Sequence, residues 1–295
     1  MLKTLTTPIS FFLNLLGYRL VKNRKKSDDM GLYYRLYGEE SVKKRSFYNI
    51  GAGGFRHPAW KNVDCPSDWY SNATTGNIDI PHDLESPDPI PVDTGTAEII
   101  YTSHTIEHIT NNAAQKLFRE AFRMLKPGGV FRATTVNIDL EVRAYLNNDR
   151  DYFYWIDDYS VEKNWKRAMY NKPMNKASLE QIFLVHFASS TSTLHADGAK
   201  ERISDEDIKR VFSDMSVPDA LDYCISKSDP EVQKKYPGNH INWWNKEKLV
   251  SSLESAGFNN IHLSAHGQSY CPPLRNLDFF DGTRPKNSIY IECIK

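Results

Sequence analysis

Phe47-Tyr48-Asn49-Ile50-Gly51-Ala52-Gly53-Gly54 is an apolar run that ends in a cluster of glycines, and an acid, Asp64, follows ten residues later. The apolar run predicts a buried strand. The glycines predict a turn where the backbone can approach a ligand, because glycine accepts positive φ and has no Cβ. Asp64 ends a second short strand, Trp60–Val63, so its carboxylate should reach the same crevice and accept two ribose hydroxyls. The pattern indicates a nucleotide-type cofactor site in an open α/β sheet.

A dinucleotide site is the main alternative for this glycine cluster. It requires G-x-G-x-x-G at the start of a full helix, with the acid about 20 residues further on. Here the pattern is G-x-G-G, the interval to Asp64 is about half that length, and Pro58 lies within it. Since Pro58 prevents a three-turn helix, no long helix N-terminus is available for a pyrophosphate. A cofactor without phosphates is therefore favoured.

The sequence after Asp64 alternates between strand and helix patterns. One helix is predicted by apolar residues at helical spacing; Asn111 or Asn112 can cap it, and a Lys-Pro-Gly-Gly sequence ends it. The order of the segments is distinctive: the acid Asp83 before Leu84, a buried strand at Ala97–Ser103, the stretch His104-Thr105-Ile106-Glu107-His108-Ile109, the helix, Lys126–Gly129 and a strand at 130–135.

This order resembles that of the class I S-adenosylmethionine (SAM) dependent methyltransferases. It is similar to a bacterial subgroup with Asn-x-Gly-x-Gly and Ser-His-x-x-Glu-His signatures, most strongly over residues 46–140 and again over 240–295. The resemblance implies an α/β fold with a Rossmann-like, seven-stranded methyltransferase sheet whose last strand is antiparallel. It also implies SAM as the cofactor.

The resemblance assigns cofactor contacts residue by residue. Asp64 would hold the ribose. Asn49 stands where the general family has an acid, so it could accept a hydrogen bond from the SAM ammonium but carries no charge. The remaining contacts would be Gly51, Ala52 and Gly53 beneath the methionine part, Asp83 and Leu84 beside the adenine, and Thr102 and Ser103 at the amino-acid end.

Four segments are expected along the chain. An N-terminal helical arm occupies 1–45, the SAM-binding α/β core 46–140, and a C-terminal part completing the sheet 240–295. Residues 141–239 break the α/β pattern and are rich in aromatic and charged side chains, so we expect a largely helical insertion that covers the substrate. Aromatic rings with polar tips suit a saccharide or another polyhydroxyl acceptor, although core packing explains most of these rings equally well.

The catalytic chemistry is expected around His104, Glu107 and His108, whose spacing would place all three on one face of a helical turn. The triplet also matches H-x-x-E-H, a zinc-peptidase signature, but that reading needs a long helix and a third ligand. A purely structural role for these side chains is a further alternative. The functional interpretation is that a histidine acts as general base, with His240 and Asp139 as other candidates.

No metal is expected in this interpretation. Some related methyltransferases hold Mg²⁺ with an acid-x-x-acid-His version of the segment, and here His104 replaces the first acid. Because Mg²⁺ prefers oxygen ligands, the replacement argues against a hard cation.

Composition is that of an ordinary globular chain. Lys+Arg and Asp+Glu are both 37, so no net charge attracts nucleic acid. The four cysteines have no regular spacing, which favours a reducing compartment and a cytoplasmic enzyme. Residues 8–26 are apolar and then basic; they could pack on this protein or a second subunit, or lie at a membrane surface.

The favoured function is therefore SAM-dependent O-methylation of a saccharide or another polar small molecule. The N-terminal Leu-Gly-Tyr segment resembles leaders of bacterial surface-glycan enzymes, which points toward capsule polysaccharide or a similar carbohydrate. Two alternatives remain open: a nicotinamide-dependent oxidoreductase, and a non-catalytic partner subunit with the SAM fold.

Overall fold

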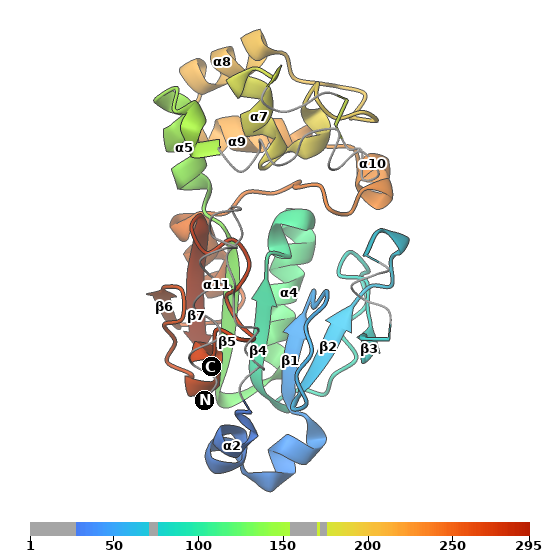
Figure 1. The fold of residues 1–295 in the computed structure, drawn as a ribbon, viewed down its shortest axis with the longest axis vertical. Coiled ribbons are helices and arrows are strands. Elements are labelled where there is room, and N and C mark those ends of the chain that lie inside the picture. The colour runs from blue at the N-terminus through green and yellow to red at the C-terminus, as the bar shows by residue number, and fades with distance from the viewer. Residues whose placement is uncertain (1–27, 71–75, 154–169, 172–175) are drawn as a thin grey trace, which may run out of the picture.

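A single seven-stranded sheet organises the chain, in the order β3-β2-β1-β4-β5-β7-β6. The structure is a computed structural model that describes residues 28–70, 76–153, 170–171 and 176–295 (Figure 1). Strand β7 pairs antiparallel with both β5 and β6, whereas the other pairs are parallel. This confirms the predicted fold class, including the antiparallel last strand. The strands are β1 (Phe47–Ile50), β2 (Trp60–Asp64), β3 (Ile80–Pro81), β4 (Ala97–Ser103), β5 (Leu125–Val136), β6 (Asn260–Ser264) and β7 (Ser288–Ile294).

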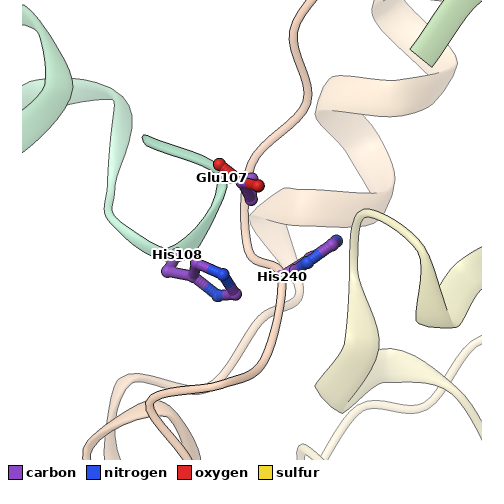
Figure 2. Close-up of side chains that lie close together, drawn as sticks. All are labelled: Glu107, His108 and His240. Atoms are coloured by element: carbon purple, nitrogen blue, oxygen red, sulfur yellow. The ribbon is translucent and has the colours of Figure 1, made fainter. Parts of the chain in front are cut away.

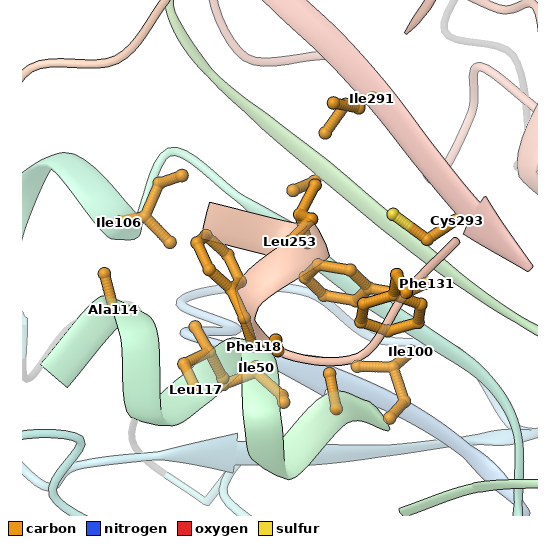
Figure 3. Packing of buried hydrophobic residues seen from close by; sticks show 14 of the residues in the cluster. Ile50, Ile100, Ile106, Ala114, Leu117, Phe118, Phe131, Leu253, Ile291 and Cys293 are labelled. Atoms are coloured by element: carbon orange, nitrogen blue, oxygen red, sulfur yellow. The ribbon is translucent and has the colours of Figure 1, made fainter. Parts of the chain in front are cut away.

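One face of the sheet packs against α4 (Asn111–Met124) and α11 (Lys246–Ser255). Phe118, Phe131 and Leu253 lie in this core and are fully buried (Figure 3). The predicted caps of α4 were wrong, because the N-cap is Thr110, whose side chain accepts a hydrogen bond from the Ala113 N–H. The Lys-Pro-Gly-Gly sequence also lies within β5 rather than between the helix and the strand.

The opposite face is covered by α2 (Met30–Lys44) and by the chain between β6 and β7, which includes the short helix η7 (Pro272–Arg275). Successive side chains of a strand point to opposite faces, so Phe47 belongs to this second core while Tyr48 belongs to the first. Tyr33 of α2 is buried against Phe47, and its hydroxyl accepts a hydrogen bond from Trp60 Nε1. Tyr33 and Tyr37 therefore pack on the sheet, whereas Tyr34 is exposed.

A buried ionic cluster ties β5 and β7 to this connecting segment. Arg132 of β5 forms an ion pair with Asp281 at 2.6 Å, and its second nitrogen lies 3.5 Å from Glu292 of β7. All three side chains are fully buried. Tyr101 completes the cluster, because its hydroxyl accepts a hydrogen bond from the Asp281 N–H.

A helical lobe lies beyond the carboxyl ends of the parallel strands (Figure 1). It has its own apolar core, in which the rings of Tyr145 and Phe183 stack with centroids 4.6 Å apart. The lobe agrees with the helical character expected for 141–239, although its first helix begins before that range, at Ile138. Its helices are α5 (Ile138–Leu146), α7 (Leu179–Val185), α8 (Asp205–Asp214), α9 (Val217–Ser226) and α10 (Pro230–Lys235); short 3-10 helices in the chain are η1 (Asp68–Tyr70), η2 (Ile106–His108) and η6 (Ser189–Thr191).

Within the described ranges, none of the helices combines the length and the apolar character needed to cross a membrane. The apolar and basic stretch at 8–26, predicted to contact another subunit or a membrane surface, lies outside the described residues. Its role stays a prediction.

Candidate active site

The glycine turn after β1 makes a close approach to Thr105, whereas the predicted approach to a ligand stays a prediction. Gly51 has φ of 69°, and a Cβ at this position would lie 2.2 Å from Thr105 Oγ1. Gly53 also has positive φ, 50°, but no atom lies within 4 Å of where its Cβ would be. The turn is therefore closed on one side by Thr105 and open at Gly53, where a ligand can pass over the backbone.

Asp64 lies at the end of β2 with its carboxylate directed at this turn. Its Oδ2 accepts a hydrogen bond from the Gly53 N–H at 2.8 Å, and its Oδ1 accepts one from the Cys65 N–H at 2.8 Å. Burial raises the pKa of Asp64, while the backbone N–H groups of Gly53, Cys65 and Ala52 act in the opposite direction. Each oxygen still has a lone pair that can accept a ribose hydroxyl.

Two buried polar atoms beside the turn have no hydrogen-bond partner among the described residues: Asn49 Oδ1 in β1 and Thr102 Oγ1 in β4. The strands are adjacent, with Ile50 opposite Thr102. A buried acceptor without a donor is costly, so Asn49 Oδ1 fits a cofactor that brings a donor such as an ammonium group, whereas Thr102 alternates to the other face of the sheet. Ser103 differs, because its hydroxyl is hydrogen-bonded to Thr134 Oγ1 at 2.8 Å.

The two residues predicted to flank the adenine lie on the loop after β3. Asp83 is exposed, and its Oδ1 accepts a hydrogen bond from the Glu85 N–H. Leu84 is half-buried against the sheet core. Burial raises the pKa of the Cys65 thiol, and the nearby Asp83 and Asp64 carboxylates raise it further. Asp83 is therefore close to the end of β2, as the prediction requires.

Two asparagines that sequence reasoning missed fix the loop after the glycines. Asn62 Nδ2 donates to the Phe55 carbonyl at 2.8 Å, and Asn77 Nδ2 donates to the carbonyls of Gly53 and Phe55 at 2.9 and 2.7 Å. Asn77 is 24 positions from Gly53, and no local pattern announces such a contact. A weak signal for Asn62 is its place between Trp60 and Val63, which are the buried apolar residues of β2.

The segment after β4 does not form the single helical face expected for His104, Glu107 and His108. His104 has φ of 51°, which is left-handed, and only Ile106–His108 form a 3-10 turn, η2. Both ring nitrogens of His104 are engaged: Nε2 is hydrogen-bonded to Ser288 Oγ at 2.8 Å, and Nδ1 lies 2.9 Å from Glu107 Oε1. In the structure His104 is therefore placed as a neighbour of the Glu107 carboxylate. Its predicted role as a base stays a prediction.

Glu107 is a buried carboxylate with 1% exposure. Its Oε2 accepts a hydrogen bond from Thr135 Oγ1 at 2.9 Å. The contact of Oε1 with His104 is close enough for an ion pair but lacks hydrogen-bond geometry, so Oε1 receives no hydrogen bond within the described part of the chain. Burial alone would raise the pKa of Glu107, but the adjacent His104 holds it well below its usual range, so the group is ionised.

His108 and His240 face each other although they lie far apart in the sequence. Their ring centroids are 4.8 Å apart (Figure 2). His108 Nδ1 donates to the Asn239 carbonyl at 2.9 Å, and His240 Nδ1 donates to the His186 carbonyl at 2.5 Å. Since a carbonyl can only accept, each Nδ1 carries a proton, and Nε2 is the ring nitrogen that can offer a lone pair. Burial, and secondarily His108, lowers the pKa of His240 to about 3.

Glu107, His108 and His240 form one cluster, in which each offers a ligand atom and these atoms lie within 4.8 Å of one another. The backbone joins them as well, because the Ile241 N–H donates to the Glu107 carbonyl at 2.9 Å. Thr105, which closes the glycine turn, precedes this cluster by two residues. The cluster is therefore next to the cofactor site and at the carboxyl end of β4.

Asp139 lies elsewhere. It is exposed on α5, and its Oδ1 accepts a hydrogen bond from Asn245 Nδ2 at 3.2 Å. It lines a pocket of about 430 Å³ with Arg143 and Leu146, and the histidines are not among the lining residues. The structure does not bring it together with the other candidate bases, and its catalytic role stays a prediction.

The chain can now be compared with known proteins. Residues 71–133, which include β4 and the Glu107–His108 segment, match a family described as a methyltransferase domain. No curated protein matches the chain. Among solved structures, a SAM-dependent methyltransferase from Thermotoga maritima, described as a possible histamine N-methyltransferase, is 12% identical with a TM-score of 0.36, over 90% of this chain and 95% of that one.

Similar values are found for two other SAM-dependent methyltransferases. The protein from Mesorhizobium loti is 10% identical with a TM-score of 0.36, over 84% of this chain and 90% of its own. The protein from Archaeoglobus fulgidus is 12% identical with a TM-score of 0.36, over 91% and 100%. At these scores the likeness does not assign the fold, which rests on the strand order. The family match and the order of the sheet together identify a methyltransferase that takes its methyl group from S-adenosylmethionine.

Proposed function

We propose that this methyltransferase transfers the methyl group to a hydroxyl of a saccharide or another polar small molecule. The observation that carries the proposal is the position of the Glu107–His108–His240 cluster. It follows β4, whose end would meet the amino-acid part of the cofactor, and in each of its two histidines Nδ1 is used by a backbone carbonyl, so Nε2 is the nitrogen that can accept a proton. A hydroxyl is a weak nucleophile until its proton is partly removed, so a group that accepts this proton assists O-methylation.

The residues around the glycine turn fit the cofactor. When bound, SAM supplies a methyl group on a sulfonium, which is transferred by an in-line attack. Asp64 would accept the ribose hydroxyls, the open backbone at Gly53 would leave room for the cofactor, and Asn49 Oδ1 would accept a hydrogen bond from its ammonium group. These contacts position the sulfonium and contribute no proton transfer.

Aromatic side chains with polar tips support a saccharide as the acceptor. Trp69 of η1 and Tyr236, which follows α10, form an edge-to-face pair with centroids 5.6 Å apart. The Tyr236 hydroxyl donates to Asp197 of the lobe at 2.5 Å. The pair joins the loop after β2 to the helical lobe. Ring faces and polar tips together suit a sugar, which has apolar faces and many hydroxyls.

We also place the reaction in the cytoplasm, as a step in surface-glycan or capsule polysaccharide synthesis. All four cysteines are free thiols, Cys65 exposed and the other three buried, which is consistent with a reducing compartment. The acceptor is not a nucleic acid in this proposal, because the chain has no net positive charge. Contact with a second subunit or a membrane surface through residues 8–26 is part of the same proposal.

The test is to incubate the purified protein with SAM and with nucleotide sugars or surface saccharides from its source, and to detect methylated products by mass spectrometry. Asp64→Ala is the matched variant. Loss of a charge-assisted hydrogen bond costs about 1.5–3 kcal/mol, so SAM affinity measured by calorimetry should fall roughly tenfold or more. Unchanged affinity in a folded Asp64→Ala protein would show that the cofactor lies elsewhere.

Two further measurements decide between this proposal and the alternatives. Calorimetry with NAD should show no binding, whereas binding of NAD in place of SAM would favour an oxidoreductase. Binding of SAM without transfer to any acceptor would favour a non-catalytic partner subunit.

A further inference from the structure

We propose that Glu107, His108 and His240 bind a divalent transition-metal ion, with Zn²⁺ as the representative ion. The three side chains form a two-histidine, one-carboxylate set whose ligand atoms lie within 4.8 Å of one another (Figure 2). Bonds to such an ion are about 2.0–2.2 Å long, so the three atoms would draw closer around it. The side chains come from two segments, η2 and the residues after α10, that meet at this point.

The hydrogen bonds that the two histidines make through Nδ1 are of the kind found in metal-binding histidines. A ligating imidazole typically donates its other N–H to a carbonyl or a carboxylate, which fixes the tautomer and the ring orientation. His108 does so to the Asn239 carbonyl, and His240 to the His186 carbonyl. Both Nε2 lone pairs are thereby directed away from their backbone partners and left for a ligand.

The carboxylate is held in the same manner. Thr135 donates a hydrogen bond to Glu107 Oε2. His104 lies close to Oε1 but does not have the geometry of a hydrogen bond to it, so the lone pairs of Oε1 stay available. Ser288 Oγ donates to the Arg284 carbonyl at 2.8 Å, so His104 Nε2 must donate to Ser288. Its other nitrogen, Nδ1, faces Glu107 Oε1 at 2.9 Å, so His104 positions the carboxylate and is not a ligand.

The segment that brings His240 to the site is fixed before any ion binds. Ser189 and His240 exchange two hydrogen bonds, from the His240 N–H to Ser189 Oγ at 2.9 Å and from the Ser189 N–H to the His240 carbonyl at 2.8 Å. Gln233 Nε2 donates to the His108 carbonyl at 2.8 Å and so ties α10 to η2. Little ordering is left to oppose binding of an ion.

The donor set selects the class of ion. Two imidazole nitrogens and one carboxylate oxygen suit Zn²⁺, Mn²⁺, Fe²⁺ and Co²⁺, whereas Mg²⁺ and Ca²⁺ prefer oxygen. Three protein ligands also leave an open position, as in catalytic zinc sites. The metal-free interpretation placed His104 in the position of a first ligand; in the proposed site His240 supplies the third ligand, so the histidine at position 104 does not count against the donor set.

The ion's function, unlike its binding, rests on the proposed O-methylation. An acceptor hydroxyl bound at the open position would lose its proton more readily, because a bound cation stabilises the alkoxide. The two histidines would then act as ligands, the ion would lower the pKa of the bound hydroxyl, and solvent water would take up the proton.

The experiment is calorimetric titration of the EDTA-treated full chain with Zn²⁺, together with the visible spectrum of the Co²⁺-loaded protein. We expect one ion per chain, and at least a 100-fold loss of Zn²⁺ affinity in both Glu107→Gln and His240→Ala, with SAM affinity retained. His266→Ala, at an exposed histidine outside the cluster, is the matched control and should bind Zn²⁺ like the unmodified protein. His108→Ala replaces His240→Ala if the latter does not fold by circular dichroism.

Absence of Zn²⁺ binding by the folded protein would overturn the proposal, as would unchanged affinity in both Glu107→Gln and a folded histidine variant. Full methyl transfer in EDTA would overturn the role of the ion. Specific Zn²⁺ binding without methyl transfer to any acceptor would instead count against the proposed function and leave the metal site in place.

Discussion

Gly51 is the position where a single added carbon has the clearest consequence. A Cβ there would lie 2.2 Å from Thr105 Oγ1, and the positive φ of 69° disfavours any L side chain. The conformational term alone is about 1–2 kcal/mol, and the overlap adds to it. We expect Gly51→Ala to lower the free energy of unfolding by more than about 2 kcal/mol in urea denaturation, and to weaken SAM binding.

Gly53→Ala is the control for that prediction, because it shares the positive φ but has open space around its Cβ. It should lose only the conformational term. Equal destabilisation by the two variants would mean that the contact with Thr105 is not the reason for a glycine at position 51.

His195 should make stability sensitive to acid. It is fully buried, its Nε2 is hydrogen-bonded to Asn239 Oδ1, and burial lowers its pKa. A pKa that is lower in the folded state than the unfolded value of about 6.5 means that protons bind preferentially to the unfolded chain. The stability contributed by neutral His195 is therefore complete above about pH 6.5 and is lost as the pH falls below it.

Chemical denaturation at several pH values from about 8 to about 5 measures the effect on the free energy of unfolding. His195→Gln should show a smaller loss of unfolding free energy on acidification than the unmodified protein. Identical pH profiles for the two proteins would assign the acid sensitivity to other groups.

Single residues of the cofactor site were predictable where their chemistry is local. Gly53 and Asp64 follow from a strand, a turn and an acid that are close in the sequence, and in the structure the Gly53 N–H donates to the Asp64 carboxylate. The left-handed backbone at His104 was not predictable, because a non-glycine residue in that conformation is held by tertiary contacts. Those contacts come from Ser288, which is 184 positions away.

Strand β5 carries a buried charged residue, Arg132, whose charge must be balanced by its neighbours. Arg132→Met would remove the cation that faces Asp281 and Glu292 in a fully buried cluster. Breaking a buried ion pair by removing one partner costs about 3–5 kcal/mol. We expect the midpoint of urea unfolding to fall accordingly. The triple variant Arg132→Met, Asp281→Asn and Glu292→Gln, which leaves no buried charge unpaired, should recover part of the loss; no recovery would point to packing rather than charge.

The elements themselves show which sequence signals are reliable. β7 is an element that the sequence marks clearly, because its side chains alternate between the two faces of the sheet. Asn245 is likewise a capping residue by type, and its side chain accepts a hydrogen bond from the Lys248 N–H at the start of α11. The cap of α4 was missed, since Thr110, Asn111 and Asn112 are all good capping residues and only the backbone conformation distinguishes them.

Taken as one body, the protein consists of a sheet and a helical lobe joined across the candidate active site (Figure 1). We expect S-adenosylhomocysteine together with an acceptor to slow hydrogen exchange in α7, α10 and the residues after α10, because the acceptor would lie between these elements and the sheet. Exchange measured by mass spectrometry with and without ligands tests this. Equal protection across the lobe would make it a structural element rather than a lid.

The arrangement of the lobe over the strand ends was predicted from the break in the α/β pattern near residue 141. The meeting of His108 with His240 was not, although each was a candidate base. The hydrogen bond between His108 and Asn239 joins residues 131 positions apart, and neither segment has a local pattern that specifies the other. Tertiary packing decides which of the candidate side chains come together. A single sequence does not specify that packing.

The same long-range contact has a consequence for how the protein folds. The sheet and the lobe have separate apolar cores, and the Glu107–His108–His240 cluster exists only where the two meet. Contacts between residues distant in sequence form late, because closing the long loop costs entropy before the contact compensates for it. After dilution from denaturant, helical circular dichroism should therefore recover before methyl transfer does. Chains arrested between these two stages would contain both cores and no active site.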